Sequence, residues 1–136
     1  MSKYRLWCKS GNEWEKESYW IGMNGCVITL RGGRPCPLNS ETHILQRSTE
    51  KYDMSGKEIF EGDIIESHTP NGQILALNMV IRYGTYQAYC PVDKEYMDSV
   101  GFYVSASGYP DMPVGALEDY AKVIGNIFEN PELLSN

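Results

Sequence analysis

The sequence predicts a mainly β protein, and three observations lead to this fold class. Two stretches, 75–83 and 100–106, carry an apolar residue at every second position. This period of two is typical of a strand that buries one face. Gly, Pro and Asn punctuate the chain at short intervals, which is typical of a sandwich or a small barrel. Ten Tyr and three Trp among 136 residues strengthen the prediction, because both residue types favour strands.

The first half is expected to contain short strands in irregular surroundings. Residues 4–8 alternate, and a turn at 10–12 would return the chain through a second short strand. Arg31-Gly32-Gly33-Arg34 is typical of a two-residue hairpin turn with charged shoulders, and a contact with RNA is the alternative. The other expected elements are strands at 26–30 and 42–46, a Gly/Pro-rich loop at 32–39 and a polar stretch at 47–55.

The second half has clearer signals. Asn71-Gly72 is a strong hairpin signal between two apolar stretches. Near the end, Asn130 and Pro131 offer a helix N-cap and a proline at the first helical position, so a short terminal helical turn should follow. The expected elements are strands at 63–67, 75–83, 100–106 and 122–128, a loop at 108–115 and one helical turn at 117–121.

These elements suggest a seam near residues 47 to 57. We expect an irregular N-terminal β region at residues 1–56, packed on a small SH3-like, partly open barrel at residues 57–136. One continuous domain with a shared core is the alternative, because 136 residues fit a single domain of ordinary size.

Composition and charge argue against several classes of function. The net charge of −6 and the scattered Lys and Arg disfavour binding to a phosphate backbone. The four Cys lack Cys-x-x-Cys spacing and the two His are isolated, so neither a metal site nor a cofactor is expected. The common catalytic motifs are missing, so an enzyme is not expected. No apolar run approaches the ~20 residues of a membrane span and residues 1–10 resemble no signal peptide, so a cytoplasmic location is expected.

Two short motifs each allow a structural and a functional interpretation. Glu61 and Asp63 flank Gly62 and could hold a hard cation or act as acid and base. The favoured interpretation is a strand-entry turn, in which Gly62 takes a conformation that other residues resist and Asp63 accepts backbone N–H groups. Gly125 within an apolar strand suggests a bulge, and Asn126 would satisfy a buried backbone group or recognise a ligand.

The three tryptophans, Trp7, Trp14 and Trp20, are the candidate interaction surface. Together with the tyrosines they could stack on single-stranded nucleic acid, but that mode also needs a basic groove, which the sequence does not offer. Burial or contact with another protein is the favoured interpretation, since Tyr and Trp are enriched in protein interfaces.

Three blocks of the chain resemble the YopX family, small proteins encoded by bacteriophages and prophages. They are the opening Lys3-Tyr4-Arg5-Leu6-Trp7-Cys8-Lys9, the central segment from Ser48-Thr49 to Gly56-Lys57-Glu58-Ile59-Phe60-Glu61-Gly62-Asp63-Ile64, and the closing segment from Val123 to Leu134. Cys8, Glu50 and Tyr52 depart from the family pattern, and a turn that needs glycine at position 50 would have to be built differently here.

The resemblance implies a β-rich fold and a phage or prophage origin, without an activity. Our leading hypothesis is therefore a non-catalytic accessory protein that binds another protein or a second copy of itself. A nucleic-acid-associated SH3-like module is the second hypothesis. A small enzyme is the third, and it would require Glu61, Asp63, His68 and Cys90 to converge in one pocket.

Overall fold

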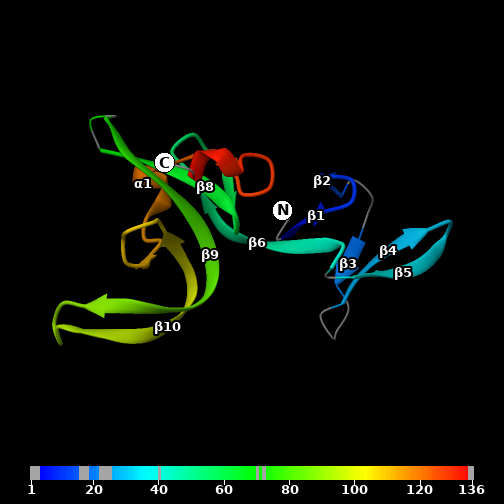
Figure 1. The fold of residues 1–136 in the computed structure, drawn as a ribbon, viewed down its shortest axis with the longest axis horizontal. Helices are drawn as coiled ribbons and strands as arrows, with labels where there is room; N and C mark the ends of the chain where they lie inside the picture. Colours follow the sequence, from blue (N-terminus) through cyan, green and yellow to red (C-terminus); the bar gives the residue numbers. More distant parts are fainter. Residues whose placement is uncertain are drawn as a thin grey trace.

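The computed structural model describes residues 4–15, 19–21, 26–39, 41–69, 71 and 73–134, with the backbone alone at residues 31 and 75–77. It confirms the mainly β fold class: strands in three antiparallel sheets dominate, and the described helices are two single turns. Figure 1 shows an elongated molecule, with the sheet of β3, β4 and β5 at one end and the tip of the β9–β10 hairpin at the other.

The N-terminal sheet has the strand order β2-β1-β6-β7. β1 (Tyr4–Cys8) pairs with β2 (Glu13–Trp14), which confirms the opening hairpin, and with β6 (His43–Tyr52). β6 continues through much of the polar stretch and pairs with β7 (Glu58–Phe60). Because β7 lies beyond residue 56, strand pairing crosses the expected boundary, and the division into 1–56 and 57–136 stays a prediction.

The small sheet consists of β3 (Tyr19–Ile21), β4 (Val27–Arg31) and β5 (Arg34–Leu38). Gly32 and Gly33 have φ of +58° and +79° between paired Arg31 and Arg34, so the hairpin interpretation is confirmed. The loop expected at 32–39 is wrong beyond the turn, since residues 34–38 form a strand. This strand is an edge of its sheet, where the N–H groups missing from its two prolines are not needed for a second ladder.

The C-terminal sheet has the strand order β11-β10-β9-β8-β12. In Figure 1 the two longest strands curve together, so the sheet forms an open half-barrel. Its strands are β8 (Asp63–His68), β9 (Ile74–Cys90), β10 (Glu95–Ser105), β11 (Met112–Pro113) and β12 (Ala121–Asn126), and the two expected helical turns are α1 (Leu117–Tyr120) and η1 (Pro131–Leu134).

The main core fills the concave side of this half-barrel. Its buried side chains come from β7, β8, β9, β10, α1 and β12, which explains why so short a helix is retained: Leu117 of α1 is completely buried. Ile64 and Val80 are buried on the opposite face of β8 and β9. The C-terminal segment lies against that face, where Asn78 Nδ2 donates a hydrogen bond of 2.9 Å to the Leu133 carbonyl of η1.

The alternation at 75–83 and 100–105 is confirmed as strand, whereas Ala106 lies beyond the end of β10, and the buried face is shorter than expected. Met79, Ile81 and Val104 lie in the core. Tyr83 and Val100 are 40% and 73% exposed, so the prediction of a continuously buried face is wrong at this end. The side chains of Leu75 and Leu77 lie outside the described residues. Tyr83 and Val100 are exposed because β9 and β10 extend beyond the body there as a long hairpin.

Candidate functional site

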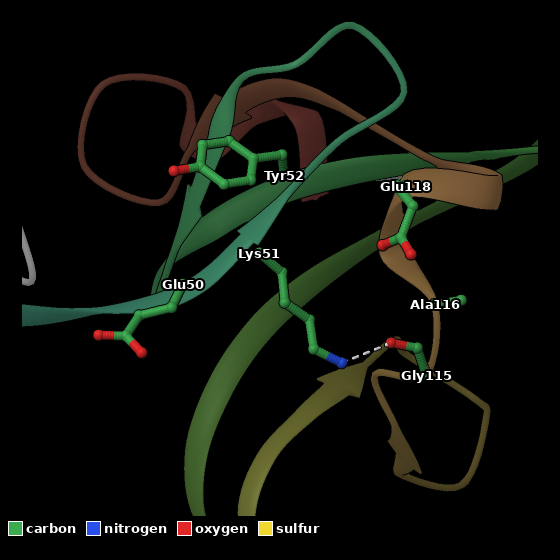
Figure 2. Close-up of a pocket in the computed structure, with 6 residues that line it drawn as sticks. All are labelled: Glu50, Lys51, Tyr52, Gly115, Ala116 and Glu118. Carbon is green, nitrogen blue, oxygen red and sulfur yellow. Dashed lines mark hydrogen bonds between the residues drawn. The ribbon is translucent and has the colours of Figure 1, made fainter. Parts of the chain in front are cut away.

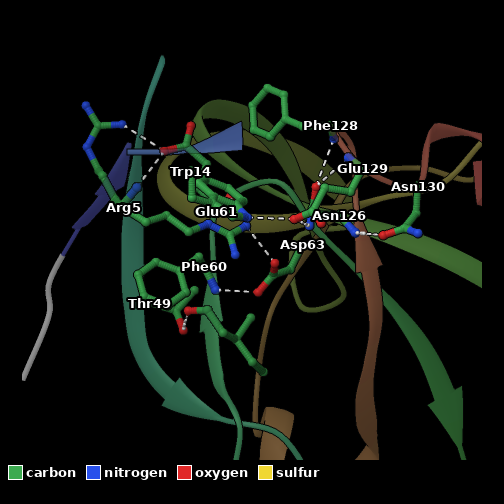
Figure 3. A network of polar contacts seen from close by, with 12 residues as sticks. Arg5, Trp14, Thr49, Phe60, Glu61, Asp63, Asn126, Phe128, Glu129 and Asn130 are labelled. Carbon is green, nitrogen blue, oxygen red and sulfur yellow. Dashed lines mark hydrogen bonds and ion pairs between the residues drawn. The ribbon is translucent and has the colours of Figure 1, made fainter. Parts of the chain in front are cut away.

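The three sequence blocks that carry the family resemblance meet in space. Figure 3 shows Arg5 of β1, the 60–63 turn and the 126–130 turn gathered around one network of polar contacts, which we call the Arg5–Asp63 junction. The segments are as much as 125 residues apart in the chain, so this junction ties both ends of the protein to its middle.

Arg5 and Asp63 form the centre of the junction. Arg5 Nη2 donates to Asp63 Oδ1 at 2.6 Å, and its guanidinium lies over the rings of Trp14 and Phe60, 4.2 and 4.7 Å from their centroids. The second carboxylate oxygen of Asp63 accepts the Phe60 N–H at 2.8 Å. Burial raises the pKa of the Asp63 carboxyl above its ordinary value, against the opposing effects of Arg5 and the Phe60 N–H.

The Glu61-Gly62-Asp63 turn therefore has the geometry of a strand entry. Gly62 has φ +87° and donates its N–H to the Ile81 carbonyl at 2.7 Å. Glu61 turns away from Asp63 and pairs with Arg47 at 3.3 Å. The two carboxylates thus have different cationic partners, and they do not form the shared acid–base or cation-binding pair that was the alternative.

The Gly125-Asn126 motif closes the junction from the C-terminal side. The pairing of β12 with β8 shifts register between Val123 and Gly125, which is the expected bulge. Asn126 Oδ1 accepts the N–H groups of Phe128 and Glu129 at 3.0 and 2.9 Å. Asn130 directly precedes η1, and its carbonyl accepts the Leu133 N–H at 3.1 Å. Its side chain points back: Oδ1 accepts the Asn126 N–H, and a Cβ at residue 125 would stand 2.6 Å from this oxygen. Pro131 begins η1.

The tryptophans of the candidate interaction surface do not lie together on an open face. Trp7 is 4% exposed, its ring stacked on Phe128 at 5.0 Å and edge-on to Trp14 at 4.9 Å. Trp14 Nε1 donates to Glu129 at 2.6 Å. Trp20 lies in the separate β3–β5 sheet and is 44% exposed. In this structure Trp7 offers no surface to a partner, and Trp14 joins β2 to the C-terminal turn.

Asp53 is a buried charged residue that the sequence did not single out. Its Oδ1 accepts the Ser55 N–H, the Ser55 hydroxyl and the Lys57 N–H, and its Oδ2 accepts the Val123 N–H at 2.9 Å. Burial alone would raise the pKa of this carboxyl, but the hydrogen bonds outweigh burial and lower the pKa. Asp53 thus joins the β6–β7 turn, which contains Gly56, to β12.

Replacing Asp53 with asparagine is expected to lower the free energy of unfolding at pH 7 by about 1–3 kcal/mol, because the amide cannot accept all four bonds. A carboxyl whose folded-state pKa is depressed stabilises the fold above its unfolded-state pKa and loses that contribution as pH falls. The difference between wild type and variant should therefore shrink below about pH 4. Urea unfolding at several pH values measures it, and a pH-independent difference would contradict this account.

A cleft of about 540 Å³ lies between the end of β6 and the segment before α1. Figure 2 shows Lys51 reaching across it, where Nζ donates to the Gly115 carbonyl at 2.8 Å. Glu50 lines this cleft and has φ +59°, so a glutamate adopts the left-handed backbone conformation at this position. The expectation that position 50 would be built differently is wrong: Glu50 adopts a glycine-like φ, at a cost of roughly 1–2 kcal/mol.

The residues of the enzyme hypothesis do not converge. His68 at the far end of β8 pairs with Glu66 at 2.9 Å, and Cys90 lies at the end of β9 near Asp93. No disulfide joins the described cysteines, Cys8, Cys26, Cys36 and Cys90. Among the described residues, no group of three or more His, Cys, Asp or Glu side chains could hold a metal ion. Neither described helical turn has the length or hydropathy of a membrane-spanning helix.

The long hairpin exposes several large apolar side chains. Residues 83–90 and 95–102 pair only with each other among the described residues, and we call this two-stranded segment the arm. The face that continues the core carries Tyr83, Val100, Tyr89 and Tyr96, all exposed. Sequence reasoning missed this surface because residues 84–98 show no simple alternation.

The opposite face of the arm has a pair of glycines at its root. Gly84 and Gly101 are paired directly across the ladder, with φ of +149° and +152° that favour glycine. The rings of Tyr86 and Tyr103 stack at 4.8 Å from the rows on either side of this glycine row.

The family model of the YopX protein matches residues 3–135 of the chain. Among solved structures, the chain is similar to the crystal structure of protein YopX from Bacillus subtilis, with 23% identity over 97% of both chains and a TM-score of 0.53. This likeness concerns the fold alone. No curated protein matches the chain.

Proposed function

Because the chain belongs to the YopX family, we propose that it is a phage or prophage accessory protein that acts in the cytoplasm of the host bacterium by binding another protein, without catalysing a reaction. The observation that carries this proposal is the arm. It exposes Tyr89 and Tyr96 by 52% and 56% and Val100 by 73%, on one face of a hairpin that protrudes from the body. Exposed aromatic patches mark protein contacts.

The contacts that the motif residues make within the fold support a non-catalytic role. Asp63 is 1% exposed and bound to Arg5, and Glu61 is bound to Arg47. Asn126 uses its carbonyl oxygen on two backbone N–H groups and its amide on Glu129. These groups hold three chain segments together, so they are engaged in the fold instead of facing a substrate.

A nucleic-acid-associated, SH3-like module is the second candidate, and one observation favours it. A cleft of about 210 Å³ at the root of the arm is lined by Arg82, Tyr83 and Tyr103, and Arg47 stacks on Tyr83 at 4.4 Å. Aromatic rings beside cations bind single strands. Glu61 in the same cleft and the net charge of −6 oppose the binding of nucleic acid. Single-stranded oligonucleotide binding that is undetectable at low salt would remove this candidate.

The protein-binding proposal is tested by comparing matched tyrosine variants as bait in a host lysate to which an untagged copy of the chain is added. The double variant Tyr89→Ser/Tyr96→Ser is expected to lose at least about tenfold in affinity for the captured protein, since aromatic anchors dominate interfaces. Tyr109→Ser, 58% exposed but outside the arm, is the control and should bind like wild type. Equal capture by all three proteins, or no specific capture by wild type, would contradict the proposal.

A further inference from the structure

We propose that the exposed face of the arm is a homodimer contact, in which the arms of two copies of this chain pack face to face and antiparallel. This inference rests on the proposed protein-binding function and names its partner. It is carried by the order of residues along the arm and by the way the arm protrudes from the body.

The exposed face has four rows of directly opposed residues from root to tip. The first and the last rows are aromatic, Tyr83 with Phe102 and Tyr89 with Tyr96, and their rings meet edge to face at 4.9 and 5.3 Å. Between them lie a small apolar row and a polar row, in which Gln87 donates to Asp98. The rows in order are Tyr83/Phe102, Thr85/Val100, Gln87/Asp98 and Tyr89/Tyr96.

This order is self-complementary under a two-fold rotation. The axis would lie between the two faces, across the strands, and midway between the second and third rows. It places each aromatic row of one copy against an aromatic row of the other, and β10 against β10. Val100 of each copy then faces Asp98 of the other. The rows are about 6.7 Å apart, so the contact would extend over roughly 20 Å. Such an interface uses the same patch on both copies and closes on itself.

The charge of the arm permits contact with a second copy. The arm and its turn, residues 83–102, contain Lys94 against Asp93, Glu95 and Asp98, which gives 1 − 3 = −2 of the total −6. Because the arm protrudes, its apolar groups can meet those of a second copy while the two bodies stay apart (Figure 1).

The size of the patch predicts a modest affinity. Three tyrosines and one valine, each exposed by 40–73%, offer on the order of 400 Å² per copy. This area is below that of a standard interface, so a dissociation constant of about 1–100 µM is expected. Sedimentation velocity over a concentration series from about 1 µM to 500 µM covers this range.

Two substitutions at one exposed position test the arrangement. Val100→Asp places a carboxylate opposite Asp98 of the other copy and should weaken dimerisation at least tenfold. Val100→Lys places an ammonium there and should retain the dimer at low salt and weaken it as salt screens the pair. The double variant Val100→Asp/Asp98→Lys should restore the dimer. Val100 is 73% exposed, so the fold is preserved, which thermal unfolding verifies, and Tyr109→Ser is the surface control.

Each outcome of the series decides one point. If the wild type stays monomeric up to 500 µM, the homodimer is overturned. The proposed function would still be upheld if the wild type captures a protein that the tyrosine variants do not capture. A dimer that none of the Val100 variants affects places the contact elsewhere and overturns the inference. Equal weakening by Val100→Asp and Val100→Lys overturns the antiparallel arrangement, because a parallel two-fold arrangement would set β10 against β9 and place position 100 opposite Thr85 instead of Asp98.

Discussion

Replacing Gly62 with alanine is expected to lower the free energy of unfolding by about 2–5 kcal/mol. Its φ of +87° costs any other residue roughly 1–2 kcal/mol. In addition, a Cβ at this position would collide with Oε1 of Gln46, a side chain that is 5% exposed. Forcing atoms into a packed site adds about 1–3 kcal/mol. Urea unfolding followed by tryptophan fluorescence measures the loss.

Gly56 provides a matched control for this substitution. It has the same φ of +87°, but nothing lies within 4 Å of a Cβ there. Gly56→Ala should therefore show only the backbone cost of roughly 1–2 kcal/mol. In a Gln46→Ala background the cost of Gly62→Ala should fall toward that value, because the colliding atom is gone. Equal losses for the two single variants would show that Gln46 moves aside freely.

The second large effect is expected for Arg5→Met, which removes the partner of a buried carboxylate and keeps the length of the side chain. Asp63 is 1% exposed, and Arg5 Nη2 lies 2.6 Å from it. Breaking such a pair from one side leaves an uncompensated charge, and we expect a loss of about 2–4 kcal/mol at pH 7. Arg47→Met is the control: this half-exposed arginine also stacks on a ring and pairs with Glu61, but a surface pair contributes less than about 1 kcal/mol.

The loss caused by Arg5→Met should depend on pH in a defined direction. Burial already raises the pKa of Asp63 in the folded protein, and removal of the guanidinium raises it further. As pH falls, Asp63 takes up a proton and no longer needs a cation. The difference from wild type should thus be largest at neutral pH and decrease toward about pH 4. A difference that stays constant from pH 7 to pH 4 would show that Arg5 acts through packing on Trp14 and Phe60.

The parts of the fold that sequence alone predicts are those with local signals. The alternation around Met79, Ile81 and Val104 reflects a core, and the turns at Gly32-Gly33 and Gly62 need only local backbone conformations. The arm lacks such a signal: between Tyr83 and Phe102 neither face of the hairpin is fully buried, so no residue pattern separates an inside from an outside.

The partners of the motif residues were not predictable either, because they are distant in the chain. Asp63 depends on Arg5, 58 residues away, and Asp53 depends on the Val123 N–H, 70 residues away. Arg5 lies in an alternating strand and Asp53 in a polar stretch. Nothing in the sequence distinguishes either residue from one that is exposed to solvent. The resemblance to the YopX family marked the segments involved, and the coordinates reveal that those segments are in contact.

The paired glycines at the root of the arm have a consequence for how relatives of this protein can diverge. A Cβ at Gly84 or Gly101 would touch nothing within 4 Å, so a larger residue there is opposed by backbone conformation alone. Substitutions in this row would redirect the hairpin and leave the half-barrel core intact. The orientation of the protrusion can therefore evolve separately from the stability of the domain that bears it.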